Sequence, residues 1–143
     1  MARRASARVE FENDQGEIVQ YLRHANGGGL VSPEANVPES ARIDQAAYVE
    51  AGARIGERTR IGVGSWLEHG AVVGNDVTIG GNVRVGVRAQ VEDGARIGSG
   101  ARIGERATIG QRAVVRSDTR VAPGAVIGRQ TTARQRARGG VAA

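Results

Sequence analysis

A strict six-residue period constrains this chain more than any other feature of its sequence. Seventeen units follow one another from Val31 to Thr132 without an inserted or missing residue. The first position of every unit is Ile, Val or, once, Leu67, and the fifth is always Ala, Thr, Ser or Val. The second position is Gly in nine units and acidic in four. Such a period indicates a repeat architecture, in which each unit packs against its neighbours.

The composition agrees with a repeat and argues against a conventional globular core. The 143 residues include 22 glycines but only one Phe, two Tyr and one Trp, and large aromatic side chains usually dominate such cores. The length suits a single domain. We expect a hairpin with a Gly-rich connection over residues 1–30, the repeat over 31–132, and a basic tail over 133–143.

Each unit has the pattern of a short strand followed by a corner. In the unit IGERTR (55–60), the side chains on either side of the first position must face outward, because side chains alternate along a strand. The third and fourth positions are polar or Gly, as corners require. Repeated corners wind the strands into a coil, where each strand pairs with its equivalent in the next turn and the backbone hydrogen bonds are satisfied.

The residues before the repeat predict a hairpin and a connection. Residues 7–23 alternate apolar and polar side chains around the turn sequence NDQG. The next residues, HANGGG (24–29), predict a flexible corner. Phosphate binding by these glycines is disfavoured, because a β unit follows them rather than a helix and no Lys-Ser or Lys-Thr pair is present.

The pattern of an aliphatic residue, Gly or an acid, two free positions, a small residue and a free position resembles the hexapeptide repeat. The resemblance implies an all-β fold: a left-handed parallel β-helix of about six turns, with eighteen residues in each turn, after the N-terminal β-hairpin. It also implies a homotrimer, the usual assembly of these coils. The left hand comes from the resemblance alone, because crossovers between parallel strands are normally right-handed.

A spacing of eighteen residues places five outward side chains in one column on successive turns. Arg and large aromatic residues are enriched where proteins meet, so the column is a candidate subunit contact or anion-binding surface. The alternative is an ordinary solvated face on which nearby acids screen the arginines. The column consists of Tyr48, Trp66, Arg84, Arg102 and Arg120.

His69 is the only histidine in the repeat and therefore the only candidate general base there. Most proteins that the repeat resembles are acyltransferases that use such a histidine, with an acyl thioester bound between neighbouring coils. A corner histidine is otherwise an ordinary solvated turn residue. The related γ-class carbonic anhydrases need three histidines for a metal, and this chain has two histidines and no cysteine, so no metal site is predicted.

Two functions from different classes remain. The enzymes usually interrupt the repeat with a loop that forms a wall of the active site, and here no interruption occurs. We therefore predict a non-catalytic structural or scaffold protein, trimeric and without a cofactor. The alternative is an acyltransferase that uses acetyl-CoA or another acyl donor, with His69 as general base at a cleft between subunits.

The basic residues and the N-terminal sequence bear on the partners and the localisation of the protein. All twenty basic residues are Arg, and the formal net charge is +5. Because Arg134, Arg136 and Arg138 have no acids near them in sequence, the tail is a candidate for weak nucleic-acid contact or for protection of the coil's end against pairing. No apolar run follows the first arginines, so we expect a cytoplasmic protein, or one incorporated in a larger assembly, without a signal peptide or membrane span.

Overall fold

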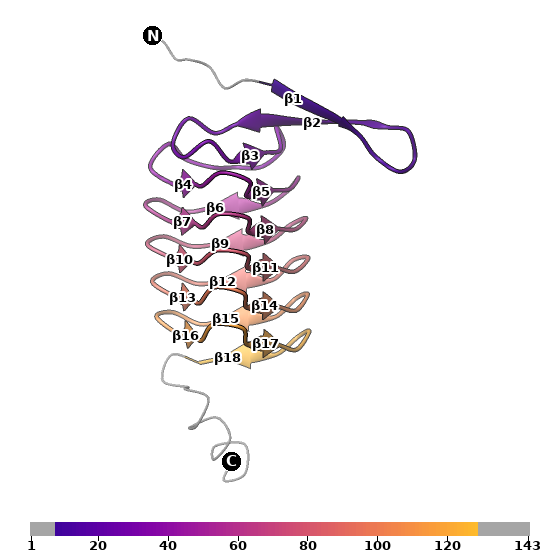
Figure 1. Ribbon diagram of the computed structural model, residues 1–143. Coiled ribbons are helices and arrows are strands. Elements are labelled where there is room, and N and C mark those ends of the chain that lie inside the picture. The colour runs from indigo at the N-terminus through magenta and orange to yellow at the C-terminus, as the bar shows by residue number, and fades with distance from the viewer. Residues whose placement is uncertain (1–7, 129–143) are drawn as a thin grey trace.

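The computed structural model describes residues 8–128, and every regular element in that range is a β-strand (Figure 1). Figure 1 shows a stack of similar turns with a hairpin at its N-terminal end. Within the same range, no helix is long and apolar enough to cross a membrane. The predicted all-β coil with an N-terminal hairpin is confirmed.

The strands form three sheets, one for each side of the coil. The first sheet contains, in spatial order, β1 (Arg8–Glu12), β2 (Ile18–Arg23), β3 (Leu30–Val31), β5 (Tyr48–Val49), β8 (Trp66–Leu67), β11 (Arg84–Val85), β14 (Arg102–Ile103) and β17 (Arg120–Val121). The second contains β4 (Arg42–Ile43), β7 (Arg60–Ile61), β10 (Thr78–Ile79), β13 (Arg96–Ile97) and β16 (Val114–Val115). The third contains β6 (Arg54–Ile55), β9 (Val72–Val73), β12 (Gln90–Val91), β15 (Thr108–Ile109) and β18 (Val126–Ile127).

Successive turns of the coil pair in parallel with a register of eighteen residues. Tyr48 lies opposite Trp66, for example, and Arg84 opposite Arg102. The sixteen strands β3 to β18, at three per turn, make a little over five turns. This is slightly fewer than predicted, because the unit that begins at Val37 forms no strand and leaves only an isolated bridge between Asn36 and Arg54.

The first and fifth positions of the units fill the interior. Ile43, Ile61 and Leu67 are fully buried, and so are most fifth-position alanines. Where the fifth position is polar, its hydroxyl is satisfied: Thr59 Oγ1 donates to the Gly74 carbonyl at 2.5 Å and accepts from the Val77 amide at 3.2 Å. The fifth position is enclosed by the coil, so only small or short branched side chains fit there, and a hydroxyl group there needs a hydrogen-bond partner.

The corners explain the remaining positions of the period. From Ala46 to Gly124, the fourth residue of every unit has a positive φ, which Gly, Asn and Asp tolerate best. Many second-position glycines lie against the next turn. A Cβ atom on Gly56, for example, would lie 2.4 Å from the carbonyl carbon of Gly74. The predicted corner at the third and fourth positions is thus where the chain bends.

The hairpin and the glycine run close part of the N-terminal end of the coil. β2 pairs antiparallel with β3, which extends the first sheet beyond the coil. The glycine run forms a hydrogen-bonded turn rather than a loose link, because the Gly29 amide donates to the Ile43 carbonyl at 2.8 Å and the Ile43 amide donates to the Asn26 carbonyl at 3.0 Å. Gly27 has φ 108° and lies close against Ile43. The domain boundaries at residues 30 and 132 stay predictions.

Candidate functional site

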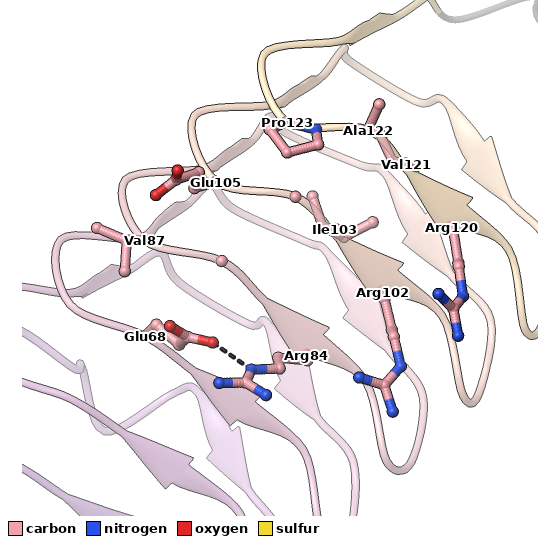
Figure 2. A pocket seen from close by; sticks show the side chains of 12 residues that line it. Glu68, Arg84, Val87, Arg102, Ile103, Glu105, Arg120, Val121, Ala122 and Pro123 are labelled. Atoms are coloured by element: carbon pink, nitrogen blue, oxygen red, sulfur yellow. Dashed lines mark hydrogen bonds and ion pairs between the residues drawn. The ribbon is translucent and has the colours of Figure 1, made fainter.

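An open hollow of about 460 Å³ runs along one corner of the coil, where the first sheet turns toward the third (Figure 2). Its floor is the corner backbone of successive turns around Gly86 and Gly104. Among the lining residues, Val87 and Pro123 are apolar and partly or fully exposed, whereas the Ile103 side chain is 2% exposed and packs in the core. Three arginines, two glutamates, Val121 and Ala122 complete the lining, so an apolar strip lies beside a charged one.

The structure brings the five predicted column residues together on the outer face of the first sheet. Each pairs with the next at one strand spacing. The two nearest the N-terminal end of the coil, Tyr48 and Trp66, are aromatic, and Trp66 is 42% exposed. The other three, Arg84, Arg102 and Arg120, line the hollow and extend side by side in Figure 2. A role of the column in subunit contact or anion binding stays a prediction.

The three arginines differ in their partners. Arg84 Nε donates to the carboxylate of Glu68, and its guanidinium carbon lies 4.7 Å from the centre of the Trp66 ring. Arg102 and Arg120 have no carboxylate partner among residues 8–128. Two neighbouring guanidinium groups without a counter-charge repel each other, so an anion in the hollow would be attracted to them.

Glu50 joins the aromatic half of the column to the hairpin. Its two carboxylate oxygens accept hydrogen bonds from the Tyr21 hydroxyl at 2.8 Å and from Trp66 Nε1 at 2.7 Å. The Tyr21 ring also meets the rings of Phe11 and Tyr48 edge to face. The sequence offered no signal for this role, since Glu50 is one of several second-position acids in the repeat.

Tyr21 makes stability depend on pH at alkaline values. Burial and the hydrogen bond to the Glu50 carboxylate raise the pKa of Tyr21 above its ordinary value of 10.0. The folded protein therefore holds this proton at pH values where the unfolded chain releases it, so this contribution is complete below about pH 10 and falls above it. We expect Tyr21→Phe to flatten the decline in melting temperature above about pH 10, measured by circular dichroism. An unchanged slope in the variant would contradict this assignment.

His69 lies at the corner directly after β8, at the edge of the hollow rather than inside it. Its side chain is exposed, and its carbonyl accepts from the Arg88 amide at 3.0 Å. The ring lies over Gly52, one turn nearer the N-terminus, where an added Cβ would be 3.2 Å from His69 Cε1. The preceding residue, Glu68, lines the hollow. No side chain among residues 8–128 forms a hydrogen bond with the imidazole.

The other histidine has a structural environment. His24 Nε2 lies 2.8 Å from the Ala41 carbonyl oxygen, within the turn that closes the coil. In the described range, no group of three His, Cys, Asp or Glu side chains is placed to hold a metal ion. The predicted contact residues of the tail, Arg134, Arg136 and Arg138, lie outside the described residues.

Residues 52–86 match the hexapeptide repeat of succinyl-transferase. The coil is also similar to solved structures of two acetyltransferases. The first is PerB from Caulobacter crescentus in complex with CoA and GDP-perosamine. It is 28% identical with a TM-score of 0.69, and the match covers 73% of this chain and 49% of PerB. The second is the acetyltransferase domain of PglB from Neisseria gonorrhoeae. It is 31% identical with a TM-score of 0.68, and the match covers 69% of this chain and 48% of the PglB domain. No curated protein sequence matches the chain.

The repeat, the three-sided coil and these similarities identify the chain as a member of the hexapeptide-repeat family of left-handed parallel β-helices. The PglB domain has also been solved with acetyl coenzyme A. The chain spans about half the length of these relatives. Their substrates and partners therefore do not transfer to it as facts.

The prediction of a non-catalytic scaffold protein without a cofactor is wrong in the light of these similarities. The coils that this chain resembles belong to acetyltransferases solved with CoA or acetyl coenzyme A. The prediction assumed that a coil without an inserted loop lacks the wall of an active site. The corner between successive turns nevertheless forms an open hollow by itself, so a loop inserted in the repeat is not needed to create one.

Proposed function

We propose that this protein is an acyl-CoA-dependent acyltransferase whose donor site is the hollow at the corner of the first sheet. The observation that carries the proposal is the pair of unpartnered guanidinium groups, Arg102 and Arg120, beside an apolar strip. CoA combines phosphate groups with a long, largely uncharged arm, so its chemistry matches both parts of the lining. The similarity to CoA-bound acetyltransferases supports the same class of reaction.

The chain's own residues divide the work between binding and proton transfer. Arg102 and Arg120 hold the phosphates, while Val87 and Pro123 contact the arm. Acyl-CoA supplies the acyl group as an activated thioester. His69, in its neutral form, takes a proton from an acceptor amine or hydroxyl group, whose nitrogen or oxygen forms a bond to the acyl carbon. The thioester C–S bond breaks, and the proton passes from His69 to the leaving sulfur, so that CoA is released as the free thiol. Arg84 pairs with Glu68, so Arg102, Arg120 and Glu105 together leave the lining of the hollow with a net charge of +1.

A homotrimer completes the site in this proposal. The hollow is open and His69 is exposed, so one coil alone cannot exclude water from the reacting groups. Hexapeptide-repeat coils usually pack side by side as trimers, and a neighbouring coil would cover the corner and the imidazole together. Light scattering on the purified protein tests this part, and a mass equal to one chain at all concentrations would contradict it.

The donor site is tested by CoA binding, with the only tryptophan as the reporter. Trp66 stacks on Arg84 at the edge of the hollow, so CoA binding is expected to change its fluorescence. Because charge-assisted hydrogen bonds contribute about 1.5–3 kcal/mol, Arg102→Ala and Arg120→Ala should each weaken binding about tenfold or more. Arg96→Ala is the matched control, because Arg96 is an exposed arginine on the second sheet. Equal affinities for all variants would exclude the hollow as the donor site.

A further inference from the structure

The open edge of the first sheet is the longest stretch of unpaired strand in the described part of the chain. β1 is the last strand in the sheet order, and it pairs only with β2 within residues 8–128. It is five residues long, whereas every strand from β3 to β18 has two. Figure 1 shows β1 on the side of β2 that faces away from the coil. Its free backbone groups can therefore be reached without moving the coil.

The two faces of β1 differ in chemistry. Arg8, Glu10 and Glu12 point to one face, and Val9 and Phe11 to the other, because side chains alternate along a strand. Phe11 remains 42% exposed although its ring packs near Tyr21. No proline or bulge interrupts the strand to discourage pairing. The edge is thus charged on one face and apolar on the other.

The order of these residues is self-complementary when two copies run antiparallel. With Glu10 at the centre, Arg8 of each copy lies opposite Glu12 of the other, which gives two pairs of opposite charge. On the other face, Val9 of each copy lies opposite Phe11 of the other. The single unfavourable pair is Glu10 against its own equivalent, since like charges directly opposite are destabilising.

We propose that β1 is the contact through which two copies of this chain associate, antiparallel and with Glu10 on the two-fold axis. The first sheet then continues from one copy into the other, and the two coils extend in opposite directions from the shared hairpins. The same surface is used by both copies, as a two-fold contact requires. This contact is at the N-terminal end of the coil and does not depend on the acyltransferase proposal.

Charge reversal at the two ends of the strand gives a test with an internal control. In the Arg8→Glu variant, positions 8 and 12 are both acidic, and in the Glu12→Arg variant both are arginine. Each single variant therefore places like charges opposite one another in the antiparallel pair. Each should weaken self-association roughly tenfold or more, measured by sedimentation velocity over a wide concentration range. An equimolar mixture of the two variants restores both opposite-charge pairs and should associate again. The double variant should also associate with itself.

These outcomes separate the proposed contact from a loss of folding. A hairpin that merely unfolds in the single variants would not regain association when the two variants are mixed. Glu10→Gln provides an independent measurement: removing the central like-charge pair should strengthen association roughly two- to fivefold. The proposal is overturned if the wild-type assembly never doubles in mass, if single reversals leave the association unchanged, or if the mixture stays unassociated.

Discussion

Replacing His69 with Ala is expected to reduce acetyl transfer by about 10²–10⁴-fold, the range that a general base usually contributes. His69 is the only histidine of the repeat, and the neighbouring Glu68 carboxylate is paired with Arg84. The measurement is release of free CoA from acetyl-CoA, with a panel of small amines and alcohols as acceptors. CoA affinity, read from Trp66 fluorescence, should change little, because the phosphates bind elsewhere in the hollow.

The matched control for this variant is the other histidine. His24 contacts the Ala41 carbonyl in the turn that closes the coil, so His24→Ala should lower the melting temperature but leave the rate per folded molecule unchanged. A rate in His69→Ala equal to that of the wild-type protein would remove His69 as the base. If CoA still bound to the hollow in that case, the donor site would stand and the base would have to come from another residue.

Gly27→Ala is expected to destabilise the protein by about 3–5 kcal/mol, which combines backbone strain at a positive φ with overpacking. Gly27 has φ 108°, and a Cβ atom there would lie 2.3 Å from the Ile43 carbonyl oxygen. That oxygen already accepts the Gly29 amide, so the clash falls on a hydrogen bond that holds the turn to β4. The measurement is urea unfolding followed by circular dichroism.

The neighbouring glycine provides a control that separates the two causes. Gly28 also has a positive φ, 85°, but the nearest atom to its added Cβ is Gln45 Cγ at 3.8 Å. Gly28→Ala should therefore cost only about 1–2 kcal/mol, the backbone part alone. If the two variants lost the same stability, close packing of the turn on Ile43 would make no contribution, and the turn would be a passive connection.

The period allowed most of the fold to be predicted. Ile43 and Ile61 had to face inward once the first position was always aliphatic, and the corner had to fall at the third and fourth positions. The spacing of eighteen residues, which the resemblance to the hexapeptide repeat implied, also aligned Tyr48 with Trp66 correctly. These predictions succeed because the repeat is local, so each unit specifies its own conformation and its contacts with equivalent units.

The interactions around the hollow could not be predicted, because they depend on side chains that share no pattern. Nothing in the sequence distinguishes Glu50, which binds Tyr21 and Trp66, from the other second-position acids. The pairing of Arg84 with Glu68, which leaves Arg102 and Arg120 as the free charges, depends on the conformations of long side chains. The scaffold prediction failed for a related reason, since a hollow at a corner requires no special residue.

The coil has two different periods, and deletions of whole units affect the two periods differently. Its interior repeats every six residues, whereas its outer surface returns to the same side only every eighteen. Deleting one unit between Arg84 and Arg102 would keep every aliphatic residue inside, but it would move all later side chains from one sheet to the next and remove Arg102 and Arg120 from beside Arg84. Deleting three consecutive units would preserve both arrangements. Changes in the length of such a chain can therefore be neutral for folding while they reassign each outward residue to a different face.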